Sequence, residues 1–327
     1  MLKAAHGCVN GSSLFPRPWR TAVAGATRSP PLQAKRRYCA RRRLRGPLAM
    51  SGSVRAALLT VGLVIATFFG PHAAFAVTLD ELYQSQTIVT GQGEVNRQIG
   101  FRDCLDRVLV RVSGDRRLLE RPEMAELRDK AGSFVDSFRY HDRMEGIPIH
   151  DEQGTHDRPH DLTCLYKPAT VNKLLASLGS KPWLGARPTL SILLAVERAG
   201  RGFVLASDGD ESPYMRDSLE AAARPMAMSI VIPDKATLTK GGFIFEEVRA
   251  MATSPELLGG DARTLGGRPL LFGNIQWRDK DLGWTVDWWL AIDGKTYDWQ
   301  IRGVSFDEAF RVAIKGAAQI LSGNGQP

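Results

Sequence analysis

GWTVDWWLAIDGKTYDWQIRGVSFDEAFRVAIKGAAQIL, residues 283–321, is the stretch of sequence that decides the fold. Apolar and polar residues alternate along 284–292 and 295–302, which predicts two β-strands that each have one apolar face. The dipeptide Asp293-Gly294 between them is favoured in two-residue hairpin turns. A capping box that starts at Ser305 predicts a helix over the rest of the stretch. The apolar stripe of this helix indicates that it packs on the aromatic face of the strands.

Apolar periodicity predicts further strands and helices outside this stretch. One expected strand ends near Thr90. The others lie at 133–144, 159–166, 189–197, 202–206, 226–232 and 270–277. The expected helices lie at 95–112, 122–132, 168–179 and 212–224. Strands and helices are mixed in both halves of the chain, so the predicted fold class is α+β.

Two prolines and a glycine in residues 181–188 predict a linker between two small domains that each combine a sheet with helices. The N-terminal α+β domain is expected over 77–180 and the C-terminal α/β domain over 189–322. Residues 323–327 would form a short tail. The second domain is expected to end in an antiparallel meander that the C-terminal helix covers.

Residues 50–76 have the anatomy of a secretory signal peptide. Arg55 gives a positive start, residues 56–69 form an unbroken apolar run, and Ala74-Phe75-Ala76 is a small-x-small cleavage site. We therefore expect export to the periplasm and a mature chain that begins near Val77. If the segment is not cleaved, it would anchor the protein in the inner membrane with the rest of the chain facing the periplasm.

Residues 1–49 contain eleven Lys or Arg and no Asp or Glu. We interpret this segment as a disordered basic extension or as the result of a mis-assigned start before Met50, although a transit peptide or a nucleic-acid arm has a similar composition. The formal net charge of the chain is +8, but 12 of its 43 basic residues precede Val77 and all 35 acidic residues follow it, which leaves −4 on the mature chain. This balance gives no indication of nucleic-acid binding.

Cys104 and Cys164 are the two cysteines of the expected mature chain. An oxidising compartment favours a disulfide between them. Such a bond would close a loop of about 60 residues and contribute roughly 4 kcal/mol. The alternative is a pair of buried free thiols that pack as small apolar residues. Both readings fit the pattern, because each cysteine lies on or beside a predicted core face.

Histidines and carboxylates are concentrated in residues 141–164, the one segment with metal-ligand potential. His150, His156, His160 and Cys164 are its candidate zinc ligands, and zinc is the one cofactor that the sequence suggests. The spacing of His156 and His160 is H-x-x-x-H, but the Glu of a zincin is missing and Pro159 would break the helix that brings both rings together. A solvated hairpin loop explains the composition equally well.

Five tryptophans lie in the C-terminal strands, and their alternation predicts that most belong to the core. Trp289 falls on the opposite face beside Asp287, so these two residues form a candidate contact surface for glycans. We find no G-x-S-x-G, P-loop, C-x-x-C or H-E-x-x-H motif. No catalytic residue is therefore assigned.

Several runs resemble a known family: VLVRVSGDRRLL at 108–119, LYKPATVNKLLASLGSKPWLGARP at 165–188 and LLFGNIQW at 270–277. In this order they are similar to domain of unknown function 2066, a family of uncharacterised Gram-negative bacterial envelope proteins. The resemblance implies an exported protein with sheets and helices, supports Met50 as the natural start and carries over no catalytic residue. The histidine-rich loop is not part of it.

The sequence therefore predicts an exported periplasmic protein that is a non-enzymatic accessory or interaction protein of the cell envelope. Two alternatives stay open. One is a metal-binding or metal-dependent hydrolytic protein that uses residues 141–164, and the other is an envelope glycan-binding module that uses the Trp-rich sheet. The expected partner is an envelope protein or a glycan, with membrane contact only through an uncleaved signal segment.

Overall fold

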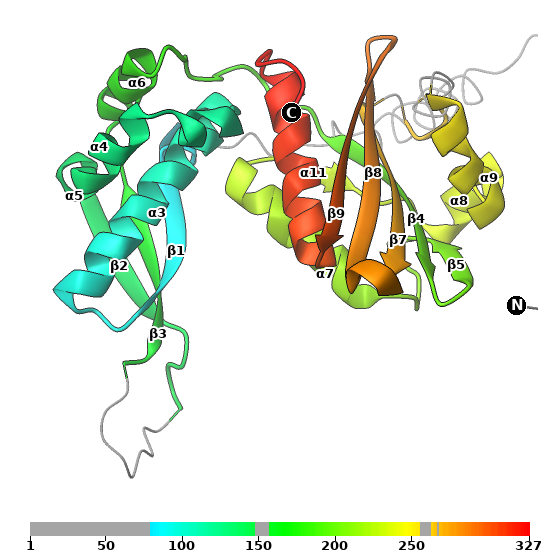
Figure 1. Ribbon diagram of the computed structural model, residues 1–327, viewed down its shortest axis with the longest axis horizontal. Coiled ribbons are helices and arrows are strands. Elements are labelled where there is room, and N and C mark those ends of the chain that lie inside the picture. Colours follow the sequence, from blue (N-terminus) through cyan, green and yellow to red (C-terminus); the bar gives the residue numbers. More distant parts are fainter. Residues whose placement is uncertain (1–78, 148–156, 256–262, 267) are drawn as a thin grey trace, which may run out of the picture. The chain divides into compact units, whose positions relative to one another are not determined.

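The computed structural model describes residues 79–147, 157–255, 263–266 and 268–327 (Figure 1). All of them belong to one compact unit, residues 73–327. The basic segment 1–49 and the expected signal segment 50–76 lie outside the described residues. Among the helices of the described ranges, none is both long and apolar enough to cross a membrane.

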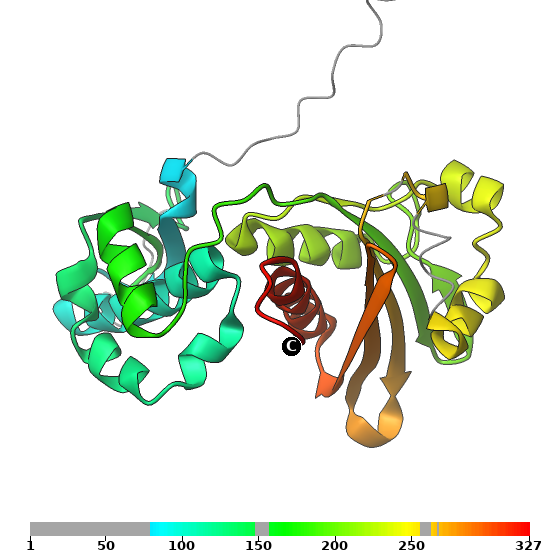
Figure 2. The same ribbon diagram turned by 90° about the horizontal axis from the view of Figure 1, so that it is seen from above.

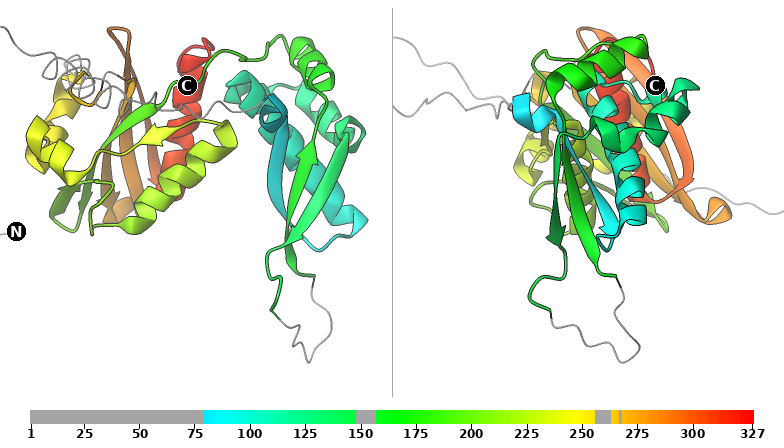
Figure 3. Two further views of the ribbon diagram at one scale, coloured as in Figure 1. Left: turned by 180° about the vertical axis from the view of Figure 1, so that it is seen from behind. Right: turned by 90° about the vertical axis from the view of Figure 1, so that its left-hand side faces the viewer.

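The first sheet has three antiparallel strands in the order β1-β3-β2. These strands are β1 (Gln84–Thr90), β2 (Ser137–Asp142) and β3 (Pro159–Leu165). The pairing of β2 with β3 confirms the predicted hairpin. Helix α3 (Glu94–Ser113) lies along one face of the sheet, as Figure 3 shows. The shorter helices of this half are α2 (Leu79–Leu82), a 3-10 helix at Arg116–Glu120, α4 (Glu123–Asp129), α5 (Ala131–Phe134) and α6 (Pro168–Ser177).

The core of this half lies between α3 and the inner face of the sheet. The apolar stripe that the sequence predicts along α3 is fully buried; it includes Phe101, Leu105 and Val108. Gly100 lets the helix approach the strands, because a Cβ at this position would come within 2.5–2.6 Å of Leu162 and Val89. The helix and the sheet therefore pack at close range.

The second sheet has six strands, with β5-β4-β7-β8-β9 in order and β6 beside β4. The strands are β4 (Leu190–Arg198), β5 (Arg201–Val204), β6 (Ile230–Val231), β7 (Leu270–Arg278), β8 (Gly283–Ile292) and β9 (Lys295–Val304). The last three form the predicted antiparallel meander. Parallel pairing of β4 with both β6 and β7 makes the sheet mixed.

Helices cover both faces of the second sheet (Figure 2). Helices α7 (Pro213–Ala223) and α11 (Phe306–Leu321) pack on one face, and α8 (Lys235–Gly241) and α9 (Phe245–Ala250) pack on the other. Trp288 and Phe310 meet edge to face in the core under α11, with ring centroids 6.2 Å apart. The α+β class and the meander covered by the C-terminal helix are confirmed.

Two local signals in the meander and its helix act as the sequence suggests. Asp293 and Gly294 both have positive φ, 50° and 74°, which is the geometry of a primed hairpin turn. Ser305 Oγ accepts a hydrogen bond from the backbone N–H of Glu308 over 3.2 Å. The Glu308 carboxylate accepts from Arg311 Nε over 2.8 Å. Ser305 therefore supplies its half of the predicted capping box, and the side chain of Glu308 binds Arg311 instead.

Several segments differ from the prediction, and the strand expected over 133–144 begins as helix α5 and is reduced to β2. The strand expected over 226–232 is reduced to β6, because Ala227 has a φ of 52° and ends the extended geometry on that side. Helices α8 and α9 were not predicted. Each is short and buries few apolar side chains, Leu238 from α8 and Val248 from α9, so neither gives a strong helical period.

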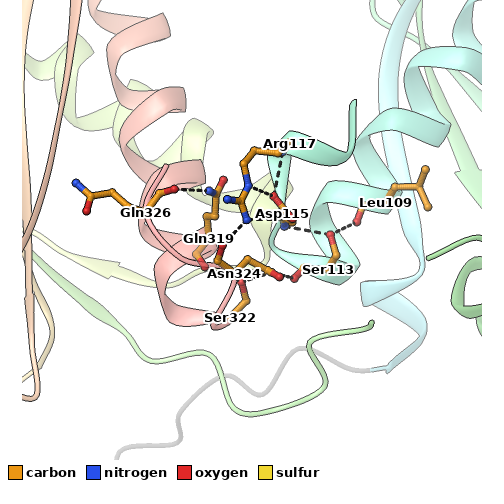
Figure 4. A network of polar contacts seen from close by, with 8 residues as sticks. All are labelled: Leu109, Ser113, Asp115, Arg117, Gln319, Ser322, Asn324 and Gln326. Carbon is orange, nitrogen blue, oxygen red and sulfur yellow. Dashed lines mark hydrogen bonds and ion pairs between the residues drawn. The ribbon is translucent and has the colours of Figure 1, made fainter. Parts of the chain in front are cut away.

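The last residues of the chain bind the end of α3 (Figure 4). Asn324 Nδ2 donates to the carbonyl oxygen of Ser113 over 2.9 Å, and the guanidinium of Arg117 donates to the carbonyl oxygen of Asn324. Gln319 Nε2 donates to the carbonyl oxygen of Gln326 over 2.9 Å. This network fixes the end of α11 beside the end of α3.

Candidate functional site

A cavity of about 330 Å³ lies between helices α3, α7 and α11. Helix α3 contributes Asp103, Asp106, Arg107 and Val110; α7 and the turn after it contribute Ser218, Ala221, Ala222, Pro225 and Met226; α11 contributes Asp307, Arg311 and Lys315; and Leu119 completes the lining. On α11 the three polar residues recur every four positions, so they share one face of that helix. The cavity is therefore lined by polar faces of the helices together with core residues at their base, Val110, Ala222 and Met226.

A second cavity of about 270 Å³ adjoins the first. Arg107, Ala221 and Pro225 line both cavities. The second is completed by Ser85, Gln86, Arg111 and Arg224. We treat the two cavities as lobes of one feature and call it the interhelical groove.

The carboxylates of the groove already have partners. Asp106 binds both Nε and Nη2 of Arg128, with N–O distances of 2.8–3.0 Å. Asp103 accepts from Arg107 Nε over 2.9 Å. Asp307 accepts from Ser218 Oγ over 2.5 Å. These acids are therefore partly neutralised within the protein.

Some cationic side chains of the groove have no ion-pair partner among the residues that the structure describes. Lys315 makes no ion pair with any residue that the structure describes, and burial, as the largest cause, lowers its pKa. Burial also lowers the pKa of Arg111, against the attraction of Glu81, and Arg111 Nη1 donates to the carbonyl oxygens of Arg224 and Pro225 over 3.4 and 3.3 Å. A group whose charged form is disfavoured by burial gains from an anion nearby. The charges of the groove therefore favour binding of a negatively charged ligand.

The lining of the groove is partly apolar, and its hydroxyl groups already donate hydrogen bonds within the protein. Its floor is apolar, formed by Val110, Leu119, Ala222 and Met226. No histidine or cysteine is among its lining residues in the described part of the chain. Its two hydroxyls donate to existing acceptors, Ser218 to Asp307 and Ser85 to the carbonyl oxygen of Cys104. A nucleophile with an adjacent strong base is therefore not assembled among them.

The proposed zinc ligands fall partly outside the described residues, since His150 and His156 lie in the undescribed segment 148–156. His160 and Cys164 lie four residues apart on β3, a strand rise of about 13 Å, which is too long for one ion to bridge. His160 is buried and its Nδ1 lies 2.8 Å from the carbonyl oxygen of Arg158. Within the described ranges no group of three or more His, Cys, Asp or Glu side chains could hold a metal ion. The metal site stays a prediction.

Cys104 and Cys164 are brought together in the core between α3 and β3, where both are fully buried free thiols. Their thiols interact: a hydrogen bond with Cys164 is the largest cause of a lowered pKa at Cys104. The pKa of Cys164 is raised, by that same hydrogen bond first and by burial second. The structure thus has the pair adjacent and reduced, and the disulfide stays a prediction.

Trp289 and Asp287 lie on the sheet face opposite α11, as the alternation predicts. Trp289 is half-buried because its ring stacks on Phe272, with centroids 5.0 Å apart. Asp287 is half-buried and accepts from Gln300 Nε2. Of the tryptophans expected in the core, Trp284 and Trp288 are buried and Trp299 is half-buried against the α11 side.

Sequence reasoning missed the interhelical groove. Its lining comes from three helices whose residues span 103–315, and no motif links them. A weak signal was present in α3, where Asp103, Asp106 and Arg107 form a polar side facing away from the apolar stripe. Only the packing of α3, α7 and α11 shows that this side lines a cavity.

One family model matches the chain, over residues 76–184, and it is described as a domain of unknown function (DUF8605). The resemblance to domain of unknown function 2066 was wrong. The runs that suggested it are short and individually unspecific, and the run at 108–119 and most of the run at 165–188 lie within the segment that DUF8605 matches. No curated protein and no solved structure matches this chain.

Proposed function

We propose that this protein is an exported, non-enzymatic interaction protein of the cell envelope and that it binds an acidic segment of a partner protein in the interhelical groove. Export is supported by the signal-like anatomy of residues 50–76. The absence of an assembled nucleophile and base among the groove residues of the described ranges supports a binding role.

The observation that carries the proposal is the mismatch of charge in the groove. Five cationic side chains line its two lobes: Arg107, Arg111, Arg224, Arg311 and Lys315. Arg107 is paired with Asp103 and Arg311 with Glu308. Arg224 and Lys315 have no ion-pair partner within the described ranges, and Arg111 is attracted by Glu81. The acids on its walls are Asp103, Asp106 and Asp307, and each is hydrogen-bonded to a protein donor. The carboxylates of a ligand would supply anionic partners for the remaining cations of the groove.

The apolar floor specifies the rest of the ligand. Val110, Ala222 and Met226 offer a surface that a polar ion alone would not use. Two adjoining lobes along three helices fit an elongated occupant that has an apolar side and an acidic side, which is how an amphipathic peptide enters a groove between helices. We therefore favour a peptide segment over a compact small molecule.

Site-specific photo-crosslinking in intact cells tests the proposal. Ala221 is exposed and lines both lobes, so a crosslinking amino acid at position 221 reports the occupant. The same amino acid in place of Glu247, which is exposed on α9 across the sheet, is the control. We expect a discrete adduct at position 221 only, with the crosslink in an acidic segment of the partner. Equal labelling at both positions, or none at 221, would overturn the proposal.

Charge reversal sharpens the same experiment. Arg224→Glu changes an exposed side chain of the second lobe and should weaken the adduct at position 221 without unfolding the protein. Lys280→Glu, outside the groove on the short 3-10 helix before β8, is the matched control. Loss of the adduct in both variants would indicate a general charge effect and contradict a specific groove.

A further inference from the structure

The sheet face opposite α11 carries a row of polar side chains across three strands. Asn274 of β7 lies directly opposite Asp287 of β8, and Asp287 lies directly opposite Gln300 of β9. Residues opposite each other on antiparallel strands have Cβ atoms about 4.5–5.5 Å apart. The three side chains therefore form a continuous row.

Alternation along each strand fixes the face on which this row lies. The neighbours Ile275, Val286 and Ile301 pack in the core under α7 and α11. Asn274, Asp287 and Gln300 consequently point to the other face. Helices α8 and α9 pack toward the β4 and β5 end of that face, and Gln300 is exposed. At the far end of β9, Thr296 Oγ1 donates to the carbonyl oxygen of Pro255, about 13 Å of strand away from Gln300.

A chain of hydrogen bonds orients the carboxylate at the centre of the row. Arg302 Nε donates to Gln300 Oε1 over 2.6 Å, and Gln300 Nε2 donates to Asp287 Oδ1. Both partners come from one strand, so the carboxylate is held by a rigid element. Such orientation before binding lowers the cost of recognising a ligand.

Asn274 supplies a second, independent observation. It is only 8% exposed, and its Oδ1 has no hydrogen-bond partner among the residues that the structure describes. Buried polar atoms are nearly always paired, so this amide oxygen next to a carboxylate still lacks a donor within the described ranges, and a ligand hydroxyl is one group that could supply it. An amide and a carboxylate side by side suit adjacent hydroxyl groups, which both donate and accept.

An aromatic ring borders the polar row. Trp289 is two residues along β8 from Asp287 and on the same face, a rise of about 7 Å. One side of its indole ring stacks on Phe272, with an interplanar angle of 26°, which holds the ring in place. A fixed, half-buried aromatic ring next to planar polar groups fits the two sides of a sugar: its apolar C–H face and its hydroxyl edge.

We propose that this face, defined by Asn274, Asp287, Trp289 and Gln300, binds an uncharged oligosaccharide of pyranose units. Trp289 stacks on one pyranose ring, and Asp287 and Asn274 bind hydroxyl groups of the same or the next unit. Asp287 and Asp298 place two carboxylates on this face beside one cation, Arg302, which favours an uncharged sugar over an anionic polymer. This site is separate from the interhelical groove, since the two share no residue.

Isothermal titration calorimetry with chitohexaose, cellohexaose and maltohexaose tests the proposal on the purified chain that begins at Val77. We expect at least one of these sugars to bind with a weak, saturable affinity. Gln300→Ala changes an exposed side chain and keeps the fold, and it should weaken binding several-fold. Asp287→Asn should weaken binding by about tenfold or more, because it removes a charge-assisted hydrogen bond.

Two controls separate this site from the alternatives. Tyr214→Ala removes an aromatic side chain that is 75% exposed on α7, and Arg224→Glu alters the groove; neither should change sugar affinity. Saturation transfer from the protein to the sugar C–H protons should fall in Trp289→Phe and stay unchanged in Tyr214→Ala. The proposal is overturned if none of the three sugars binds, or if binding survives Asp287→Asn combined with Gln300→Ala.

Discussion

The indole ring of Trp299 on β9 lies directly against Gly316 on α11. A Cβ added at Gly316 would come within 2.9, 3.0 and 3.1 Å of three atoms of that ring. Alanine in a helix is normally more stable than glycine by up to about 1 kcal/mol. Overpacking against a ring that cannot withdraw costs about 1–3 kcal/mol, so we expect Gly316→Ala to destabilise the protein by about 1 kcal/mol.

Urea unfolding checks this prediction, and a second background isolates its cause. In Trp299→Leu the ring atoms are gone, and Gly316→Ala should then stabilise the protein through helix propensity alone. The change of sign between the two backgrounds is the diagnostic result. If Gly316→Ala has the same effect in both, contact with Trp299 does not decide the residue at position 316.

The contact between Asn324 and Ser113 predicts that the C-terminal residues contribute to stability. Asn324 Nδ2 reaches the Ser113 carbonyl oxygen over 2.9 Å and Ser322 Oγ over 2.8 Å. Asn324→Ala leaves a carbonyl of a buried residue without this donor, and we expect a loss of about 1–2 kcal/mol. In a chain of this size the melting temperature should fall by roughly 2–4 °C for each kcal/mol.

Gln326→Ala is the matched control for Asn324→Ala. It removes a side-chain hydrogen bond to the carbonyl oxygen of Asp298 that is exposed to solvent, so the melting temperature should change little. Asn324→Asp keeps the shape but removes the donor and should destabilise as much as alanine does. A melting temperature of Asn324→Asp equal to that of the parent would contradict the role given to this hydrogen bond.

The N-terminus of α11 gives a third prediction. Ser305 Oγ is the side-chain cap of this helix, and Ser305→Ala should cost about 1 kcal/mol in the free energy of unfolding. Ser305→Asp should keep the cap. Because the Glu308 carboxylate binds Arg311 at the surface, Glu308→Gln should change stability by less than about 0.5 kcal/mol. Denaturant midpoints of the three variants test this ranking, and an equal cost for Ser305→Ala and Glu308→Gln would indicate a complete capping box.

The sequence was most informative where one local pattern fixes one element. Alternation along 284–292, the turn at Asp293-Gly294 and the cap at Ser305 predict the meander and its helix, and each is present. The same local logic failed at 226–232, because the left-handed backbone of Ala227 depends on packing around the end of α7.

The candidate sites were harder to predict because they depend on register and on packing. Trp289 and Asp287 could be placed on the outer face from alternation alone. Asn274 joins them only because β7 and β8 pair in one register, and Arg107 and Lys315 line one cavity only because the fold brings α3 and α11 to it from distant parts of the chain. Neither relationship leaves a pattern in the order of residues along the chain.

A fourth prediction concerns Tyr166 and alkaline pH. Tyr166 is 5% exposed, its hydroxyl lies near Ser85 and Cys164, and burial, as the largest cause, raises its pKa. In the unfolded chain this phenol ionises near pH 10. Above that pH the folded state holds one more proton than the unfolded state, so stability is fully present below about pH 10 and falls as the pH rises.

Tyr166→Phe should therefore act differently in two pH ranges. At neutral pH it removes a buried hydroxyl and its contacts with Ser85 and Cys164, so stability should change by no more than about 1 kcal/mol. Above pH 10 it should reduce the steepness with which stability falls, by up to about 1.4 kcal/mol per pH unit. The raised pKa of Cys164 acts in the same direction from a lower pH, so some alkaline loss should remain in the variant.

Urea unfolding at pH 8, 10 and 11 under reducing conditions measures both effects. Tyr214→Phe is the matched control, because its ring is 75% exposed. That variant should keep the full alkaline slope of the parent protein. Should Tyr166→Phe also keep it, the phenol of Tyr166 would have to ionise as easily in the folded chain as in the unfolded one, and its burial between α3 and the first sheet would not control its titration.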